Sequence, residues 1–147
     1  MIAVDTNILI YAHRRDSPWN LDAKDRLREL AEGIGTWCIP WTCLHEFYGV
    51  VTHPRVFTPP STLTEALDQI ALWMESPSLS ILSEGPTYWP ALQTTLIDAN
   101  ITGPRIHDAR IAALCIQHGV TTLWSADRDF SRFGRLKVVN PLVRKVR

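Results

Sequence analysis

Carboxylates follow two apolar runs of the chain, at positions where they would serve either as metal ligands or as helix caps. In "TLWSADRDFSRF", residues 122–133, an apolar run gives way to Asp127 and Asp129 with an arginine between them. In "VDTNILIYA", Asp5 follows the apolar start of the chain. Capping and metal binding have the same local signature, a short acidic side chain after a strand. The choice depends on whether other acids reach the same place in the folded chain.

Two further acids are candidates for that place. Glu46 lies about one turn into "CLHEFYGVV", a predicted helix after the second apolar run, and Asp108 lies in the first turn of "HDARIAAL", where a negative charge suits the helix dipole. Each alone is explained as an exposed helix acid or a cap. Four converging carboxylates, however, would repel one another unless they took up protons or shared a cation. An all-oxygen ligand set without Cys or paired His favours Mg²⁺ or Mn²⁺ over zinc.

Some acidic and imidazole side chains have stronger structural explanations. An Asp before "FSRF" is typical of an N-cap on a short helical turn, so we expect Asp127 to belong to the site and Asp129 to cap or support the backbone beside it. For Asp5, in "DTN", the helix-cap explanation and the metal-site explanation are equally well supported. His45 and His107 each neighbour a candidate acid. Such histidines more often pack or form hydrogen bonds, and we leave both out of the catalytic set.

The hydrophobic pattern predicts the strands and helices that must position these acids. Apolar runs predict four strands and a candidate fifth, at residues 2–4, 36–40, 79–82, 120–124 and 136–140. Helical patterns lie between them, at residues 7–13, 22–32, 43–51, 63–74, 87–99 and 102–119. Thr42 is the expected N-cap of the third helix, and Gly33 and Gly119 are expected helix stops.

This alternation of strands and helices predicts an α/β fold. We expect a three-layer α/β/α sandwich with a central parallel sheet of four to five strands and right-handed crossovers. In such sheets the functional crevice lies beyond the carboxyl ends of the strands. Asp5 ends the first strand and Asp127 comes three residues after the fourth. The sequence therefore predicts that these two acids, Glu46 and Asp108 meet at one end of the sheet.

Length and composition indicate one globular domain, residues 1–147. Hydrophobic residues make up 46% of the chain and charged residues 20%, unlike a disordered protein. No apolar run approaches the roughly 20 residues that span a bilayer, and the N-terminal apolar segment has its arginines on the wrong side for a secretory signal. We expect a cytoplasmic protein without a membrane association. Its three cysteines form no CxxC pair and are expected to be buried free thiols.

Charge is distributed unevenly. The formal net charge is zero, which argues against indiscriminate nucleic-acid binding. Residues 1–100 hold 6 basic and 12 acidic residues, whereas residues 101–147 hold 9 basic and 3 acidic residues. The basic C-terminal third, ending in "VRKVR", would suit phosphates or an acidic partner, although solvated surface charge is the commoner explanation. Most of the six tryptophans are expected in the core, with one or two on a surface groove.

Four signals occur in a fixed order along the chain: "VDTNILIYA", a Glu on the helix after the second strand, "HDARIAAL" and "TLWSADRDFSRF". Together they resemble the PIN-domain ribonucleases, particularly the VapC-type toxins of toxin–antitoxin pairs. The resemblance runs from the first residues to about Phe133. It implies a single PIN-like domain and an endoribonuclease that hydrolyses RNA phosphodiester bonds.

The resemblance also implies roles for individual residues. The implied acidic quartet is Asp5, Glu46, Asp108 and Asp127. Of these, Asp5, Asp108 and Asp127 would hold Mg²⁺ or Mn²⁺. The residues that would support the acids or approach the phosphate are Thr6, Asn7, Ser125 and Asp129. The candidates for contacts with RNA phosphates are Arg110, Arg128 and Arg132, although a solvated or paired arginine is the commoner case.

The implied chemistry is metal-assisted hydrolysis. The metal would polarise a phosphodiester oxygen and lower the pKa of a bound water, and Glu46 or Asp127 would accept the proton, a choice that the sequence leaves open. The resemblance further implies a homodimer and a cognate antitoxin, which lays a helix or tail across the active-site side and presents a basic residue to the acids.

Two other function classes fit part of the pattern. A PIN-like protein-binding module with little intrinsic catalysis fits the near-zero net charge, and it would be favoured if the purified protein cleaved no RNA with Mg²⁺ or Mn²⁺. A HAD-like phosphatase also places Asp after its first strand. That class needs a second Asp two residues later, where this chain has Asn7, so we rank it last.

Overall fold

The structure, a computed structural model, describes residues 1–143. Five short strands form one sheet: β1 Ile2–Val4, β2 Trp37–Pro40, β3 Leu79–Leu82, β4 Thr122–Trp124 and β5 Lys137–Val139. Every neighbouring pair is parallel, in the order β3-β2-β1-β4-β5. The four predicted strands and the candidate fifth are confirmed, each within two residues of its expected start.

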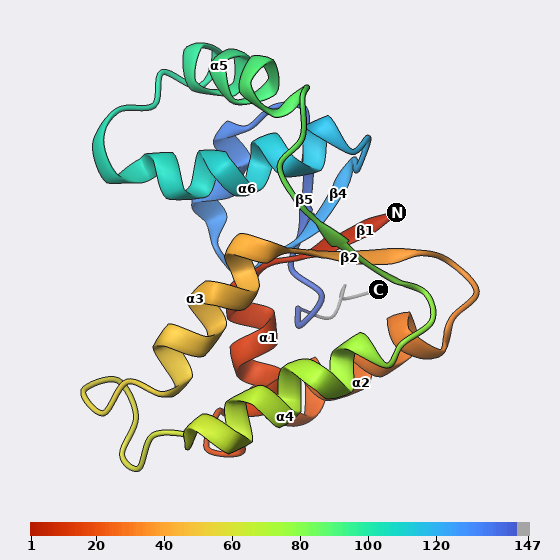
Figure 1. Cartoon of the computed structure of the whole chain (residues 1–147), viewed down its shortest axis with the longest axis vertical. Coiled ribbons are helices and arrows are strands. Elements are labelled where there is room, and N and C mark those ends of the chain that lie inside the picture. The colour runs from red at the N-terminus through yellow and green to blue at the C-terminus, as the bar shows by residue number, and fades with distance from the viewer. Residues whose placement is uncertain (144–147) are drawn as a thin grey trace.

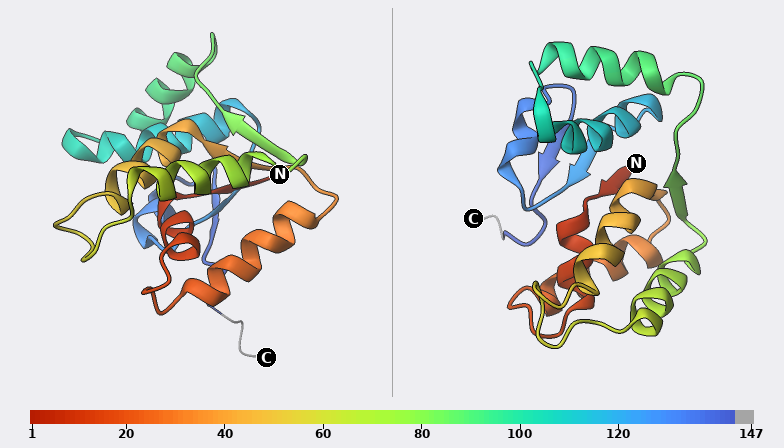
Figure 2. Two further views of the ribbon diagram at one scale, coloured as in Figure 1. Left: turned by 60° about the horizontal axis from the view of Figure 1, so that its bottom comes forward. Right: turned by 60° about the vertical axis from the view of Figure 1, so that its left-hand side comes forward.

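The helices occupy the segments between the strands: α1 Thr6–His13, α2 Asn20–Glu32, α3 Trp41–Val51, α4 Leu63–Met74, α5 Tyr88–Asp98 and α6 Ile106–Gln117, with 3-10 turns η1 Gly103–Arg105 and η2 Arg128–Arg132. Figure 1 shows α5 and α6 together on one side of the sheet, and α1 to α4 on the other. The right-hand view of Figure 2 shows the same separation. The predicted three-layer arrangement is therefore confirmed. No helix within residues 1–143 is long and apolar enough to cross a bilayer.

The order of the strands creates a crevice beside β1. From β1 the chain moves outward through β2 to β3, then crosses the sheet and returns to β4 on the other side of β1. The register pairs Val4 with Trp124, and the Asp5 amide donates a hydrogen bond to the Trp124 carbonyl (2.9 Å). Where the direction of the strand order reverses, the helices that follow the two strands lie on opposite faces, which leaves a crevice at the carboxyl ends.

The strands are apolar because helices cover both faces of the sheet. All four residues of β2 are buried, as are Ala3 and Val4 of β1. The three cysteines are buried and free, as predicted. Only half of the tryptophans are buried, which corrects the expectation that most are core residues. The buried ones are Trp37, Trp73 and Trp124, and the exposed ones are Trp19, Trp41 and Trp89.

Residue types at the helix ends predict the observed caps and stops, with one exception. Gly33 caps the end of α2, and Gly119 has φ +70° just after α6, a conformation that Gly adopts without strain. Thr42 is not the N-cap of α3, which corrects the prediction. The helix begins at Trp41, directly after β2, and Pro40 takes the cap position without a side-chain bond. Of the basic "VRKVR" ending, residues 144–147 lie outside the described residues.

Candidate active site

Asp5 serves both as a helix cap and as the most deeply buried acid of the site. It is the N-cap of α1, and its Oδ1 accepts a hydrogen bond from the Thr6 amide (2.7 Å). Its Oδ2 accepts a hydrogen bond from the Ser125 hydroxyl (2.7 Å). Only 5% of Asp5 is exposed. The helix-cap and metal-site explanations for Asp5 are therefore compatible, because one oxygen caps the helix and the other faces the segment after β4.

Ser125 connects the two strands at the crevice. While its hydroxyl donates to Asp5, its oxygen accepts hydrogen bonds from the Asp127 amide (3.0 Å) and from the side-chain amide of Asn7 (3.3 Å). The side-chain Oδ1 of Asn7 in turn accepts a hydrogen bond from the Ala126 amide (3.2 Å). These bonds tie the first turn of α1 to the loop after β4. The predicted supporting residues Asn7 and Ser125 thus lie beside the acids.

The capping roles of Asp127 and Asp129 are the reverse of the prediction. Asp127 is the N-cap of η2, and its Oδ1 accepts a hydrogen bond from the Asp129 amide (2.8 Å). Asp129 lies in the first turn of η2 and is exposed. The physical reason is geometry, since the residue before the turn has the extended backbone (φ −91°, ψ 115°) that lets a side chain reach the free amides.

The electrostatics of the acids show that they share one environment. Burial raises the pKa of Asp5 to about 6, against the hydrogen bonds from Ser125 and Thr6, and the charges of Glu46 and Asp108 raise it further. Partial desolvation raises the pKa of Glu46, and the charge of Asp108 adds to the rise. The pKa of Asp108 is raised by desolvation and then by the charges of Asp127 and Asp129. Charge interactions therefore connect Asp5, Glu46 and Asp108, and the charge of Asp127 reaches Asp108.

Cationic side chains lie unevenly around the acids. Arg132 opposes the rise in the pKa of Asp108, and its Nε donates to the Asp129 carbonyl (3.0 Å). Arg128 is exposed. Arg110 lies on the other flank of α6, where it affects the pKa of Tyr88 in α5. Of the three predicted RNA contacts, Arg132 is the one whose charge reaches the acids.

Two residues near the acids were not assigned to the site from the sequence. His107 opposes the rise in the pKa of both Glu46 and Asp108, so its imidazole lies near both carboxylates. The sequence feature that could have assigned His107 to the site is its position next to Asp108 at the start of a helix. Cys43 is fully buried, and its thiol donates to Asp5 Oδ1 (3.8 Å). The sequence feature that could have assigned Cys43 to the site is its position in the first turn of the helix after β2.

The donor set fits an oxygen-preferring cation in its chemistry. Neighbouring carboxylates raise the pKa values of Asp5, Glu46 and Asp108, and a cation among them would reverse that effect. The buried Thr6 hydroxyl lies close enough to lower the pKa of Glu46, yet no hydrogen bond of good geometry satisfies it. Within residues 1–143, no three His, Cys, Asp or Glu side chains are arranged to hold an ion as they stand.

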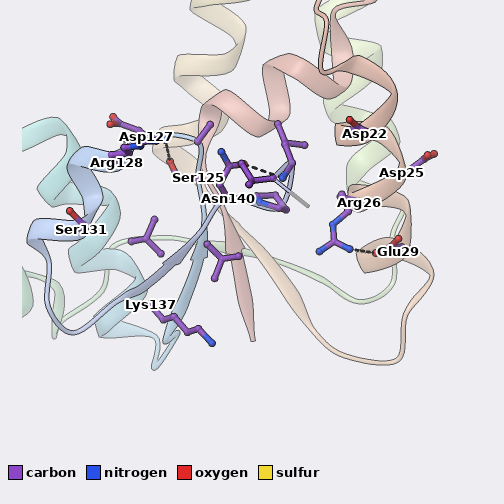
Figure 3. A pocket seen from close by; sticks show the side chains of 16 residues that line it. Asp22, Asp25, Arg26, Glu29, Ser125, Asp127, Arg128, Ser131, Lys137 and Asn140 are labelled. Carbon is purple, nitrogen blue, oxygen red and sulfur yellow. Dashed lines mark hydrogen bonds and ion pairs between the residues drawn. The ribbon is translucent and has the colours of Figure 1, made fainter. Parts of the chain in front are cut away.

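A cleft of about 1200 Å³ opens beside Asp127, between α2 and β5 (Figure 3). Arg128 and Lys137 line one side of it, and Arg26, which pairs with Glu29 (2.9 Å), lies on the other. The acids on the α2 side are Asp22, Asp25 and Glu29. Asp127 is the one member of the quartet that lines this cleft, so the cleft extends sideways from the acids, and its mixed charges do not single out one ligand.

Comparison with known proteins finds consistent matches over nearly the whole chain. The family pattern described as "PIN domain" matches residues 2–136. Ribonuclease VapC43 of Mycobacterium tuberculosis is 36% identical over 142 residues, which cover 97% of this chain and 96% of that protein.

Solved structures give the same picture of the fold. The crystal structure of VapBC2 from Rickettsia felis, bound to a DNA fragment from its promoter, has a TM-score of 0.64 at 24% identity, covering 95% of this chain and 98% of that one. VapC20 of Mycobacterium tuberculosis, described as a sarcin–ricin loop cleaving toxin, has a TM-score of 0.65 at 17% identity, covering 89% and 93%. At these identities the two structures establish likeness of fold.

Proposed function

The chain belongs to the PIN-domain family, and from this premise we propose that it is a metal-dependent endoribonuclease, the toxin of a toxin–antitoxin pair. We also propose that its 147 residues form one PIN-like domain, since the family pattern spans residues 2–136. The relative VapC43 is named a ribonuclease, and the structural neighbour VapC20 is described as a sarcin–ricin loop cleaving toxin. These names support the activity and the biological class.

The observation that carries the proposal is the charge interaction among acids of separate segments. Glu46 and Asp108 raise the pKa of Asp5, and Asp127, together with Asp129, raises the pKa of Asp108. A cluster of carboxylates with raised pKa values in a partly desolvated crevice is costly for a protein that uses it only for structure. The cost is offset when a cation neutralises the cluster. Divalent cations with oxygen ligands are suited to phosphodiester hydrolysis.

Asp5, Asp108 and Asp127 are the proposed holders of Mg²⁺ or Mn²⁺. When bound, the cation would polarise a phosphodiester oxygen and lower the pKa of an attacking water. Asp5 is held in place by Thr6 and Ser125, so it presents a fixed carboxylate. Asp127 is held through its cap on η2. These bonds hold two of the three carboxylates before the cation binds, which reduces the reorganisation that binding requires.

Glu46 is the proposed acceptor of the proton from the attacking water. One oxygen of Asp127 is already occupied by the Asp129 amide, whereas Glu46 is exposed and has the unsatisfied Thr6 hydroxyl nearby to orient it. A carboxylate with a raised pKa is a better proton acceptor at neutral pH than an ordinary one. Arg132, whose charge already reaches Asp108, is placed to contact an RNA phosphate.

Substitution of Asp108 tests the proposal. We expect Asp108→Asn to lower Mn²⁺- or Mg²⁺-dependent cleavage of structured RNAs by at least about 100-fold, with an unchanged circular dichroism spectrum, because the change removes charge and keeps shape. The matched control is Asp98→Asn, an exposed acid at the end of α5, which should cleave like the wild type. Equal cleavage by folded Asp108→Asn would contradict the proposal. If wild-type protein cleaved no RNA under any condition, the binding-module alternative would be favoured.

An antitoxin and a second copy of the chain are the proposed protein partners. A basic residue of the antitoxin would reach the acids, because the crevice concentrates negative charge that no salt bridge within residues 1–143 neutralises. Co-expression with the adjacent open reading frame, followed by co-purification and mass measurement by light scattering, would reveal both partners. A monomer that ignores the neighbouring gene product would contradict this part of the proposal.

A further inference from the structure

Trp41 is an exposed aromatic residue at the carboxyl edge of the sheet. It is the first residue of α3, directly after β2, and 40% of it is exposed. The other exposed tryptophans lie away from a strand's carboxyl end: Trp19 precedes α2 and Trp89 lies in α5. Core packing does not account for a large apolar ring at the surface on the strand edge where the acids gather.

The indole of Trp41 is part of a stacked pair. Its ring lies over that of His45, one turn later on the same face of α3, with centroids 6.0 Å apart and planes inclined by 28°. His45 is exposed as well. The contact restricts the rotation of the indole and extends its flat surface. The pair therefore presents an aromatic platform to solvent at the start of α3.

The exposed face of α3 leads from this platform to the acids. With about 100° of rotation per residue, His45 lies between Trp41 and Glu46 around the helix. Gly49 follows on the same exposed face, and no atom lies within 4 Å of the position that a side chain would take there. Trp41 and Glu46 are about 7.5 Å apart along the helix axis. That distance corresponds to about two stacked nucleotides at about 3.4 Å each.

We propose that Trp41, supported by His45, is the stacking platform for an unpaired nucleobase of the RNA strand, one or two nucleotides from the phosphate that is cleaved. The proposal rests on the proposed ribonuclease function, because that function places the phosphate at the acids. Unpaired bases of RNA are recognised by stacking on aromatic side chains such as Trp and His. Such a platform tolerates any base, since every base has a π-face.

The surroundings of the platform favour a nucleobase over a protein partner. A protein docking face requires a contiguous apolar patch. The exposed neighbours of Trp41 on α3 are instead polar or bare: His45, Glu46 and Gly49. The buried residues of α3 are apolar: Cys43, Leu44, Phe47 and Val51. A single flat ring beside polar groups matches the size and chemistry of one base.

The test measures RNA binding separately from cleavage. In an Asp108→Asn background, which prevents cleavage, the affinity for a fluorescent single-stranded RNA of mixed sequence is measured by anisotropy with Trp41→Ala, Trp41→Phe and Trp89→Ala. We expect Trp41→Ala to weaken binding by about 10- to 100-fold, Trp41→Phe to retain most of the affinity, and the control Trp89→Ala to bind within about twofold of its parent.

Abasic nucleotides make the test specific for stacking. A single abasic nucleotide is placed at each position of the RNA in turn. At one position we expect it to weaken binding to the protein that retains Trp41 by about the same factor as Trp41→Ala does with intact RNA. Combining that abasic RNA with Trp41→Ala should cause no further loss of affinity. Equal losses in Trp41→Ala and Trp89→Ala, no sensitive position, or no RNA binding would each overturn the platform. So would an unchanged RNA affinity combined with lost self-association, because Trp41 would then be a protein contact.

The two proposals fail in different measurements. Cleavage by the wild type with Mn²⁺ tests the ribonuclease, whereas the abasic comparison tests the platform through binding alone. Cleavage without a sensitive abasic position would overturn the platform and leave the ribonuclease standing. A sensitive position without cleavage by the wild type would overturn the ribonuclease and identify Trp41 as part of an RNA-binding site.

Discussion

At the scale of single residues, Asp5 shows how one side chain carries two requirements. Its Oδ1 caps α1 and its Oδ2 holds the Ser125 hydroxyl, so the carboxylate is fixed before any cation or substrate arrives. The same burial that fixes it destabilises its charge, as the raised pKa shows. A residue selected only to cap the helix would be better exposed, where the charge costs little.

The cost of the Asp5 charge predicts a pH-dependent stability. The pKa rises from 3.8 to about 6 on folding, so the folded state loses stability as the pH rises through this window. Asp5→Asn, without metal and with a chelator, should be more stable than the wild type at pH 8 by on the order of 3 kcal/mol, at about 1.36 kcal/mol per pKa unit. The advantage should shrink toward pH 4.5. Urea unfolding of both proteins across this range measures it, and a difference independent of pH would contradict the assignment.

At the scale of elements, the 3-10 turn η2 positions Asp127, the last acid of the site. Its extended entry lets Asp127 cap the turn with one oxygen, and the Ser125 oxygen accepts a hydrogen bond from the Asp127 amide. Phe130 of η2 is buried in the core, which anchors the turn to the sheet. The acid is therefore positioned by backbone geometry and packing together. Asp129, two residues further along, is exposed and has no such support.

Replacing each aspartate of η2 separates the two roles. Asn is as good an N-cap as Asp, so Asp127→Asn should keep η2 and change the free energy of unfolding by less than about 1 kcal/mol. It should nevertheless lower metal-dependent RNA cleavage by at least about 100-fold, because a ligand charge is lost. Asp129→Asn is the matched control and should cleave within a few-fold of the wild type. The opposite order of effects would assign the fourth acid to Asp129.

At the scale of the whole molecule, the sheet brings distant segments to one crevice. Asp5 and Ser125 are 120 residues apart and share a hydrogen bond of 2.7 Å. The crevice exists because β1 lies between β2 and β4, with helices on both faces of the sheet. A cation bound among acids from four segments would therefore stabilise the whole fold rather than one element.

Metal binding should raise the thermal stability of the protein. At a free Mn²⁺ concentration of about 100 times the dissociation constant, the wild type should gain about 2.7 kcal/mol of stability at pH 7.5. Asp108→Asn should lose most of this gain and Asp98→Asn should keep it. At pH 5 the gain should be smaller in the wild type, because protonation of Asp5 competes with the ion. Calorimetry with and without Mn²⁺ measures these shifts, and an equal gain in Asp108→Asn would place the ion elsewhere.

The order of the elements and the identity of the candidate acids were predictable from the sequence, because hydrophobic periodicity and turn residues act locally. The strands around Asp5 and the helix that carries Asp108 were located in this way, and strand–helix alternation implied that their carboxyl ends would meet. The same local rules place glycine stops such as Gly119 correctly.

Tertiary structure alone decided what depends on contacts between distant segments. The hydrogen bond from Ser125 to Asp5 and the exposure of Trp41 follow from packing, which no local pattern encodes. Thr42 is not a cap because α3 starts directly after β2, and Asp127 rather than Asp129 caps η2 because the backbone at Asp127 is extended. The sequence by itself determined which acids the protein has and in what order, and only the folded chain determined how each carboxylate is held.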